Sequence, residues 1–122
     1  WRRVLDAGGE LALGSDFPVE LADPTHGLFA AITRQDQTGD PEGGWLPDQR
    51  LDRYEALRGF TLDAARSLFL EDEVGSLEVG KRADLTVFAA DPMTMPVAEI
   101  PTVAIDMTLV DGEIVHRREG AP

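Results

Sequence analysis

The chain has 122 residues, with 23 Asp and Glu against 11 Lys and Arg, and a formal net charge of −12 at pH 7. Nucleic acids and anionic membranes are bound by clusters of Lys and Arg, and the basic clusters here are only dyads, so we expect no nucleic-acid partner and no membrane partner. The absence of cysteine excludes disulfides and thiolate metal ligands, and it fits a cytoplasmic protein.

The first part of the chain has the pattern of a short strand followed by a helix. Residues 10–13 are partly apolar and precede a Gly-Ser pair, which predicts a short buried strand that ends in a loop. Asp23 before Pro24 is the pattern of an N-cap followed by a proline at the first helical position. Apolar residues at helical spacing then predict a helix over residues 24–34. Residues 35–49 are rich in Gly, Pro, Asp and Gln, and predict a surface loop.

Two further helices are predicted after this loop. Asp52 and Glu55 have the spacing of a capping box, which predicts a helix start. Gly59 is expected to end this helix, and Thr61 to cap a second helix that ends near Leu70. The expected inner stripe of the second helix consists of Leu62, Ala65 and Phe69.

From Gly75 the spacing of apolar residues changes from the helical period to alternation, which predicts strands. Leu77 and Val79 form the first alternating segment, and residues 83–88 form the next strand. Residues 92–101 contain three prolines and predict a loop.

A hairpin is predicted at the end of the chain. Apolar residues alternate over residues 103–110, which predicts a half-buried strand. Asp111 and Gly112 then have the sequence of a two-residue type I′ turn, and residues 113–116 are expected to return antiparallel. The chain is therefore expected to be α/β, with helices before Gly75 and strands after it.

A nucleotide-binding loop is excluded at the start of this β region. Residues 75–81 have two glycines and a lysine at phosphate-loop spacing, but Arg82 stands where such a loop needs Ser or Thr to reach magnesium. The element order is also reversed, because a helix is predicted before this segment and a strand after it.

Asp16 is the candidate catalytic residue. It follows the predicted strand, and catalytic groups of α/β barrels lie at the carboxyl ends of strands, where a carboxylate can bind a metal and accept a proton. The alternative is that Asp16 only caps a turn. His26 is expected to be a solvated or hydrogen-bonded surface histidine, and His116 to be structural. One histidine does not make a metal site, since zinc requires three or four ligands.

Several stretches, in chain order, are similar to the amidohydrolase superfamily, in the branch named amidohydrolase family three or YtcJ-like. They are residues 12–19 (ALGSDFPV), 24–34, 61–66 (TLDAAR), 75–88 (GSLEVGKRADLTVF) and 110–115 (VDGEIV). The resemblance implies a fragment of a TIM-barrel metal-dependent hydrolase. Residues 1–72 would be the end of the barrel, with its last strand, insertion helix, loop and helix pair, and residues 73–122 the C-terminal part of a small β-sandwich.

The resemblance also implies an activity, the hydrolysis of amide, cyclic amide or related C–N bonds by a metal-activated water. In the family one aspartate both binds the metal and shuttles the proton, and the resemblance implies that Asp16 has this role. The family's other ligands, several histidines and often a carboxylated lysine, have no matching positions, so we expect them on a missing N-terminal barrel segment. The complete protein is then expected to bind a divalent metal, preferably zinc, and a small-molecule substrate.

For this chain alone we expect no tightly bound metal and no activity, and we expect self-association. The alternative function is a non-catalytic interaction or structural module that uses the β portion to pair with a partner. The two functions differ in one requirement, since only the enzyme needs a set of metal ligands upstream in its gene.

Overall fold

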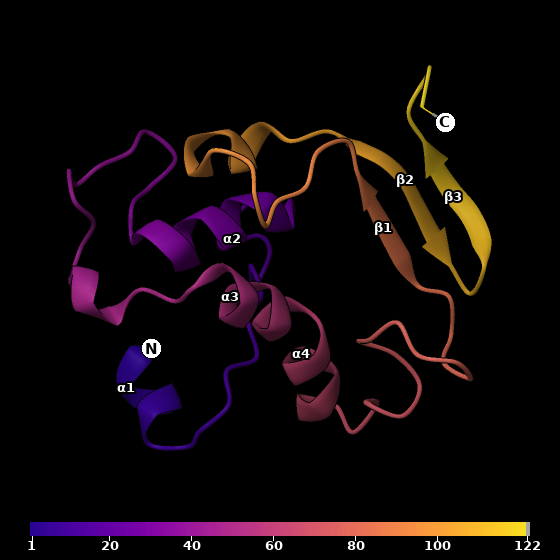
Figure 1. Cartoon of the computed structure of the whole chain (residues 1–122), viewed down its shortest axis with the longest axis horizontal. Coiled ribbons are helices and arrows are strands. Elements are labelled where there is room, and N and C mark those ends of the chain that lie inside the picture. Colours follow the sequence, from indigo (N-terminus) through magenta and orange to yellow (C-terminus); the bar gives the residue numbers. More distant parts are fainter. Residues whose placement is uncertain (122) are drawn as a thin grey trace.

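The structure, a computed structural model, describes residues 1–121 and has a helical part beside a three-stranded sheet (Figure 1). The helices are α1 (Arg2–Asp6), α2 (Pro24–Thr33), α3 (Arg53–Phe60) and α4 (Leu62–Ser67), with the 3-10 helices η1 (Pro47–Gln49) and η2 (Val97–Thr102). The strands are β1 (Leu85–Phe88), β2 (Ile105–Val110) and β3 (Glu113–Arg117). Within residues 1–121, no helix is both long enough and apolar enough to cross a bilayer.

Helix α2 forms as its capping sequence predicts. The Asp23 carboxylate accepts hydrogen bonds from the Thr25 backbone N–H at 3.0 Å and from the Thr25 hydroxyl at 2.8 Å. Pro24 occupies the first turn, where the missing N–H costs no helical hydrogen bond. The helix ends at Arg34, which takes a left-handed conformation. The prediction of a helix over residues 24–34 is confirmed to within one residue.

The predicted helix pair is present, but its second member is shorter than expected. Both halves of the Asp52–Glu55 capping box form. Helix α4 ends at Ser67, and the prediction that Phe69 lies on its inner face is wrong, because this side chain is 91% exposed. Phe69 has a φ of 60°, and the Leu70 N–H donates to the Ala65 carbonyl at 3.0 Å, which is the closing bond of a Schellman motif. This motif stops the helix before Phe69.

Two predicted strands are absent from the described residues. Residues 10–13 are extended but form no strand, and their backbone is joined to the helices by a bond from the Leu13 N–H to the Gly59 carbonyl, at 2.9 Å. Leu77 and Val79 lie in a segment of turns and are fully or almost fully exposed. A strand needs a neighbour for its ladder, and residues 1–121 supply none beside either segment.

The sheet is antiparallel with the order β1-β2-β3. Asp111 and Gly112, between β2 and β3, have φ values of 52° and 82°, and positive φ at both positions is what a type I′ turn requires. The predicted tight hairpin is confirmed. Asp106 is the buried residue of β2, and its carboxylate forms an ion pair with Arg118 at 2.6 Å.

The hydrophobic core lies between the helices, and η2 contributes to it. The core consists of Leu28, Phe29, Ala31, Leu51, Ala56 and Ile100. Ile100 is 1% exposed and belongs to η2, so the prediction that residues 92–101 form only a loop is wrong. Helix η2 packs beside α2 (Figure 1), although residues 97–102 were expected to belong to the sandwich. This segment therefore ties the β region to the helices.

Glu55 also attaches the N-terminal helix to α3. A hydrogen bond from the Arg2 guanidinium holds the pKa of the Glu55 carboxyl below its ordinary value. A lowered pKa in the folded state adds stability that is fully present above the unfolded value, about 4.3, and is lost as the pH falls through the folded value.

We therefore expect Glu55→Gln to lower the free energy of unfolding at pH 7, and the difference from wild type to shrink toward pH 3. Gln keeps one acceptor oxygen for the capping box, while the Arg2 guanidinium loses the negative charge and one of its two acceptors. Urea denaturation of dilute protein at several pH values measures the effect, with the exposed Glu42→Gln as control. A difference that stays constant with pH would contradict the assignment.

Candidate functional site

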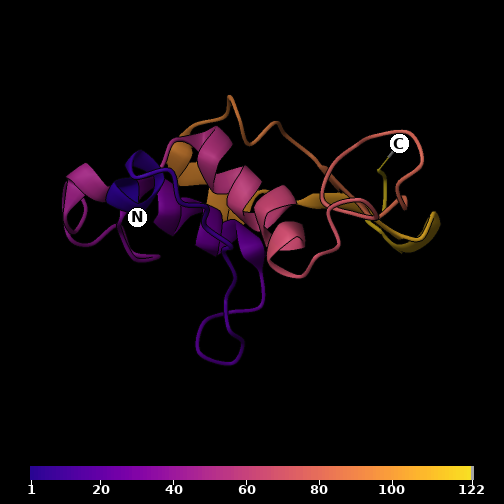
Figure 2. The ribbon, with the colours of Figure 1, turned by 90° about the horizontal axis from the view of Figure 1, so that it is seen from below.

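Asp16 lies in the loop between the extended segment and α2, and this loop projects from the body of the molecule (Figure 2). Its side chain is exposed and its φ is 49°, in the left-handed region that aspartate tolerates better than most residues. Two backbone bonds close the loop, from the Val19 N–H to the Asp16 carbonyl at 2.9 Å and from the Glu20 N–H to the Ser15 carbonyl at 3.2 Å.

The Asp16 carboxylate differs from the carboxylates that cap turns in this protein. The Asp36 carboxylate accepts a bond from the Thr38 N–H at 2.8 Å, and that of Asp91 accepts one from the Met93 N–H at 2.8 Å. Among residues 1–121 no such bond to the Asp16 side chain is found. Within the described residues, Asp16 therefore does not cap its turn through a side-chain hydrogen bond, and its role stays a prediction.

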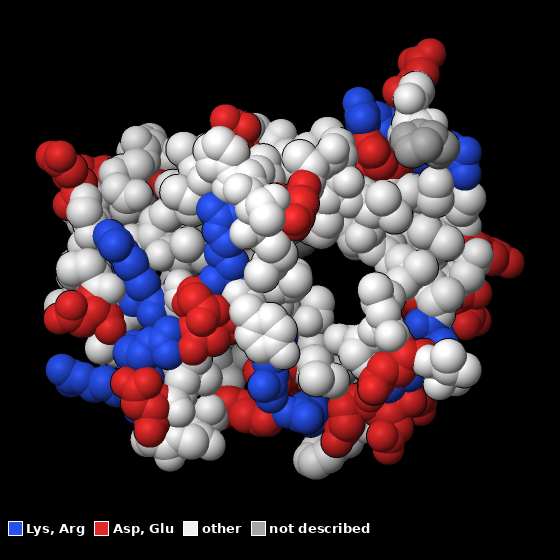
Figure 3. Space-filling view, in the orientation of Figure 1, with Lys and Arg blue, Asp and Glu red and all other residues white. Residues whose placement is uncertain are grey.

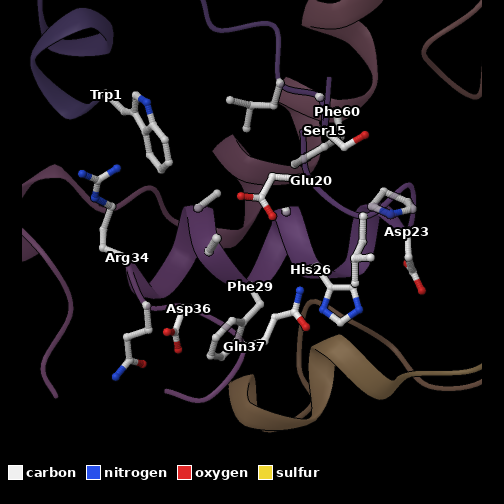
Figure 4. Close-up of a pocket in the computed structure, with 18 of the residues that line it drawn as sticks. Trp1, Ser15, Glu20, Asp23, His26, Phe29, Arg34, Asp36, Gln37 and Phe60 are labelled. Carbon is white, nitrogen blue, oxygen red and sulfur yellow. The ribbon is translucent and has the colours of Figure 1, made fainter. Parts of the chain in front are cut away.

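A cavity of about 610 Å³ runs along α2, and we name it the α2 cavity (Figure 4). Its apolar wall includes Leu13, Gly27, Phe29, Ala30, Ala31 and Phe60. Gly14 and Ser15 also line it, and they directly precede Asp16 in the chain. Asp16 therefore follows two lining residues in the chain but is not itself part of the wall.

Charged and aromatic side chains surround the α2 cavity. Figure 4 shows Glu20 over α2, with Trp1 and Arg34 at one end and Asp23 at the other. The Arg34 guanidinium lies 4.2 Å from the centre of the Trp1 ring and 4.8 Å from that of Trp45, which are cation–π distances. These contacts fix the C-terminal end of α2 and one wall of the cavity.

The two histidines occupy different environments. His26 lines the α2 cavity, and its Nδ1 is buried without a hydrogen-bond partner among the described residues. The prediction that this ring is solvated or hydrogen-bonded is therefore wrong for Nδ1. His116 lies on β3, where its Nε2 is 3.3 Å from the Ile105 carbonyl oxygen. The structure does not bring either histidine into a ligand cluster with Asp16.

The described residues do not form a metal centre by themselves. In residues 1–121 no group of three or more His, Cys, Asp or Glu side chains is placed to hold an ion, and zinc requires three or four ligands. The donor set of this chain therefore fits a divalent metal only if other residues complete it.

An ion-pair network at the junction of α3 and α4 was missed by the sequence analysis. The buried Asp63 carboxylate pairs with Arg58 at 2.9 Å and with Arg66 at 3.5 Å. Arg66 also pairs with Glu10 at 2.6 Å, at the start of the extended segment. On the face shown in Figure 3, basic side chains lie among acidic ones rather than in one continuous basic surface.

Comparisons with known proteins identify the family. The model of the family described as "Amidohydrolase family" matches residues 1–116. The N-substituted formamide deformylase of Arthrobacter pascens is 34% identical over 98% of this chain and 22% of that protein. The putative amidohydrolase YtcJ of Bacillus subtilis is 29% identical over 97% of this chain and 22% of that protein.

The fold also matches a solved enzyme structure. The crystal structure of an amidohydrolase from Thermotoga maritima superimposes with a TM-score of 0.68 and 26% sequence identity, over 95% of this chain and 25% of that one. The chain therefore spans about a quarter of the length of the proteins it matches.

Proposed function

This chain belongs to the amidohydrolase family, and from this premise we propose that it forms the C-terminal part of a metal-dependent hydrolase that cleaves C–N bonds. The observation that carries the proposal is the position of Asp16. Within the segment that resembles the family's last barrel strand and the loop after it, Asp16 is an exposed carboxylate that no described residue engages. By the complete protein we mean this chain together with the remaining barrel segment.

The proposed barrel explains two features of this chain, the alternating burial of residues 10–13 and the open α2 cavity. Leu11 and Leu13 are half-buried while Glu10 and Ala12 are exposed, which is the alternation of a strand that lacks its neighbours. The α2 cavity beside Leu13 is largely apolar, and large open apolar surfaces favour association. We propose that the remaining barrel segment pairs with residues 10–13 and fills this cavity.

The proposed role of Asp16 is to hold the metal together with ligands outside this chain and to accept a proton from the attacking water. The metal, for which we propose zinc, would supply the activated water. Small-molecule amides or cyclic amides are the proposed substrates. A relative named N-substituted formamide deformylase supports amides that are not peptides.

The test is hydrolysis by the complete protein of a panel of N-substituted formamides, cyclic amides and peptides. We expect turnover of a non-peptide amide, its loss after chelation, and its return when zinc is added. Turnover that survives complete metal removal, or cleavage of the peptides alone, would overturn the proposal.

The 122-residue chain by itself is expected to show no hydrolysis and only weak zinc binding, because its donor set is incomplete. We also expect it to associate, since the α2 cavity and the exposed loop side chains Phe17 and Val19 are open to water. Metal analysis of the purified chain and analytical sedimentation measure these properties. Stoichiometric metal, or a monomer at high concentration, would contradict them.

The alternative function, a module that pairs through its β portion, is favoured by one observation. Strand β3 is exposed along its whole length and forms an edge of the sheet, with Ile114 and Val115 open to solvent. An open edge of this kind favours pairing with another strand. In the complete enzyme this edge would pair with the other strands of the proposed sandwich. We also propose that the complete protein is cytoplasmic and homo-oligomeric.

A further inference from the structure

We propose that Gly59 is a positioning residue, whose missing side chain sets the place of Asp16. The inference rests on the proposed function, in which Asp16 is the reacting carboxylate. Gly59 lies in α3, far from Asp16 in the chain. Glycine is needed there because the backbone of α3 comes close to that of residues 11–13.

The space at Gly59 explains why this buried position of α3 holds a glycine. A Cβ atom there would lie 2.8 Å from both Cγ and Cδ1 of Leu13 and 3.1 Å from the Leu11 carbonyl oxygen. Glycine is much less favourable than alanine in a helix interior, and the φ of Gly59 is not in the left-handed region. The glycine is therefore required by space, and not by its backbone conformation.

The close approach is also the point at which the extended segment is fastened. The Leu13 N–H donates to the Gly59 carbonyl at 2.9 Å, and the Leu13 side chain packs against the core. A second attachment is formed by Glu10, which pairs with Arg66 at 2.6 Å and Arg58 at 3.4 Å. The junction of α3 and α4 thus holds the segment at its beginning and near its end.

The attachment at Leu13 lies only three residues before Asp16. Gly14 and Ser15 are the only residues between Leu13 and Asp16, and the loop is closed by the bond from Glu20 to the Ser15 carbonyl. A displacement of Leu13 is therefore passed on to Asp16. A shift of about 1 Å in a reacting group can lower a rate about 100-fold.

Gly59→Ala is expected to displace the segment rather than the helix. Beside Gly59 on α3, Ala56 is completely buried, so the helix has no room to withdraw. On the other side the obstacle includes the Leu11 carbonyl, which is backbone and does not rotate away. Leu13→Ala removes the two closest atoms, Cγ and Cδ1, and should therefore relieve most of the clash.

The experiment compares Gly59→Ala, Leu13→Ala and the double variant in the complete protein. For Gly59→Ala we expect kcat to fall by at least about tenfold with KM changed by less than about twofold, and faster hydrogen exchange at the Leu13 amide. The double variant should recover kcat relative to Gly59→Ala, and it should restore protection of that amide. Tyr54→Ala, at an exposed position of the same helix, is the matched control and should leave both quantities unchanged.

Wild-type kcat and wild-type exchange at Leu13 in Gly59→Ala would overturn the inference. A loss of kcat that accompanies a fall in melting temperature, and that Leu13→Ala does not relieve, would also overturn it, since this describes general destabilisation. An active Asp16→Asn enzyme would instead refute the role of Asp16 in the proposed function. The exchange measurement would still decide whether Gly59 positions the segment.

Discussion

Asp16→Asn is expected to lower the turnover of the complete protein by at least about 10²–10⁴-fold, the usual contribution of a general base, while the melting temperature stays close to that of wild type. The amide keeps the size of the side chain and one acceptor oxygen, but it has no negative charge and does not accept a proton at neutral pH. Asp16 is exposed, and no described residue donates to its carboxylate, so the fold does not depend on its charge.

The turn-capping alternative forecasts a different result. Asn tolerates a left-handed conformation and caps turns about as well as Asp, so near-normal turnover would refute the catalytic assignment. Kinetics and melting are measured on the same preparation, with Asp72→Asn, another exposed aspartate, as control. The control should leave both quantities unchanged, and a large fall in melting temperature at Asp16→Asn would contradict a purely chemical role.

The features that the sequence predicted well are those decided by a few neighbouring residues. The N-cap at Asp23, the capping box of Asp52 and the hairpin at Asp111 all form as expected, because each depends on hydrogen bonds or φ values within one turn. The end of α4 is local too, but it was missed. It places Phe69 in a left-handed conformation, where glycine is the usual residue.

The strands predicted at residues 10–13 and at Leu77 did not form, for a different reason. Alternation shows that a segment is suited to a sheet, but the strand forms only when a neighbour supplies the hydrogen bonds. The pattern at residues 10–13 is still visible in the alternating burial of Leu11 and Leu13. Leu77 is almost fully exposed, so nothing in the described part of the chain covers it.

The candidate site also has parts that neighbouring residues indicate and parts that depend on residues far apart in the sequence. Asp16 was predicted from its place after an expected strand and from a short stretch that resembles a family, and the chain belongs to that family. Gly59 and the pairing of Glu10 with Arg66 were not found, since they join segments that are far apart in the sequence. A glycine inside a predicted helix was the available signal, but it was interpreted as a helix end.

Ile100→Ala is expected to lower the free energy of unfolding by about 2–5 kcal/mol, the range for truncating a buried isoleucine to alanine. Ile100 is 1% exposed and is the largest fully buried side chain among the described residues. It belongs to η2, which packs against α2, and it shares the core cluster with Leu28 and Ala56.

Ile114→Ala is the matched control for this prediction. It removes the same atoms from a side chain that is 49% exposed on β3, so its effect should be well below that of Ile100→Ala. Urea denaturation of dilute protein, followed by circular dichroism, compares the two variants. Equal losses would show that η2 is not part of the core. A much larger loss at Ile100, in a single unfolding transition, would show that η2 is part of the core that stabilises the chain.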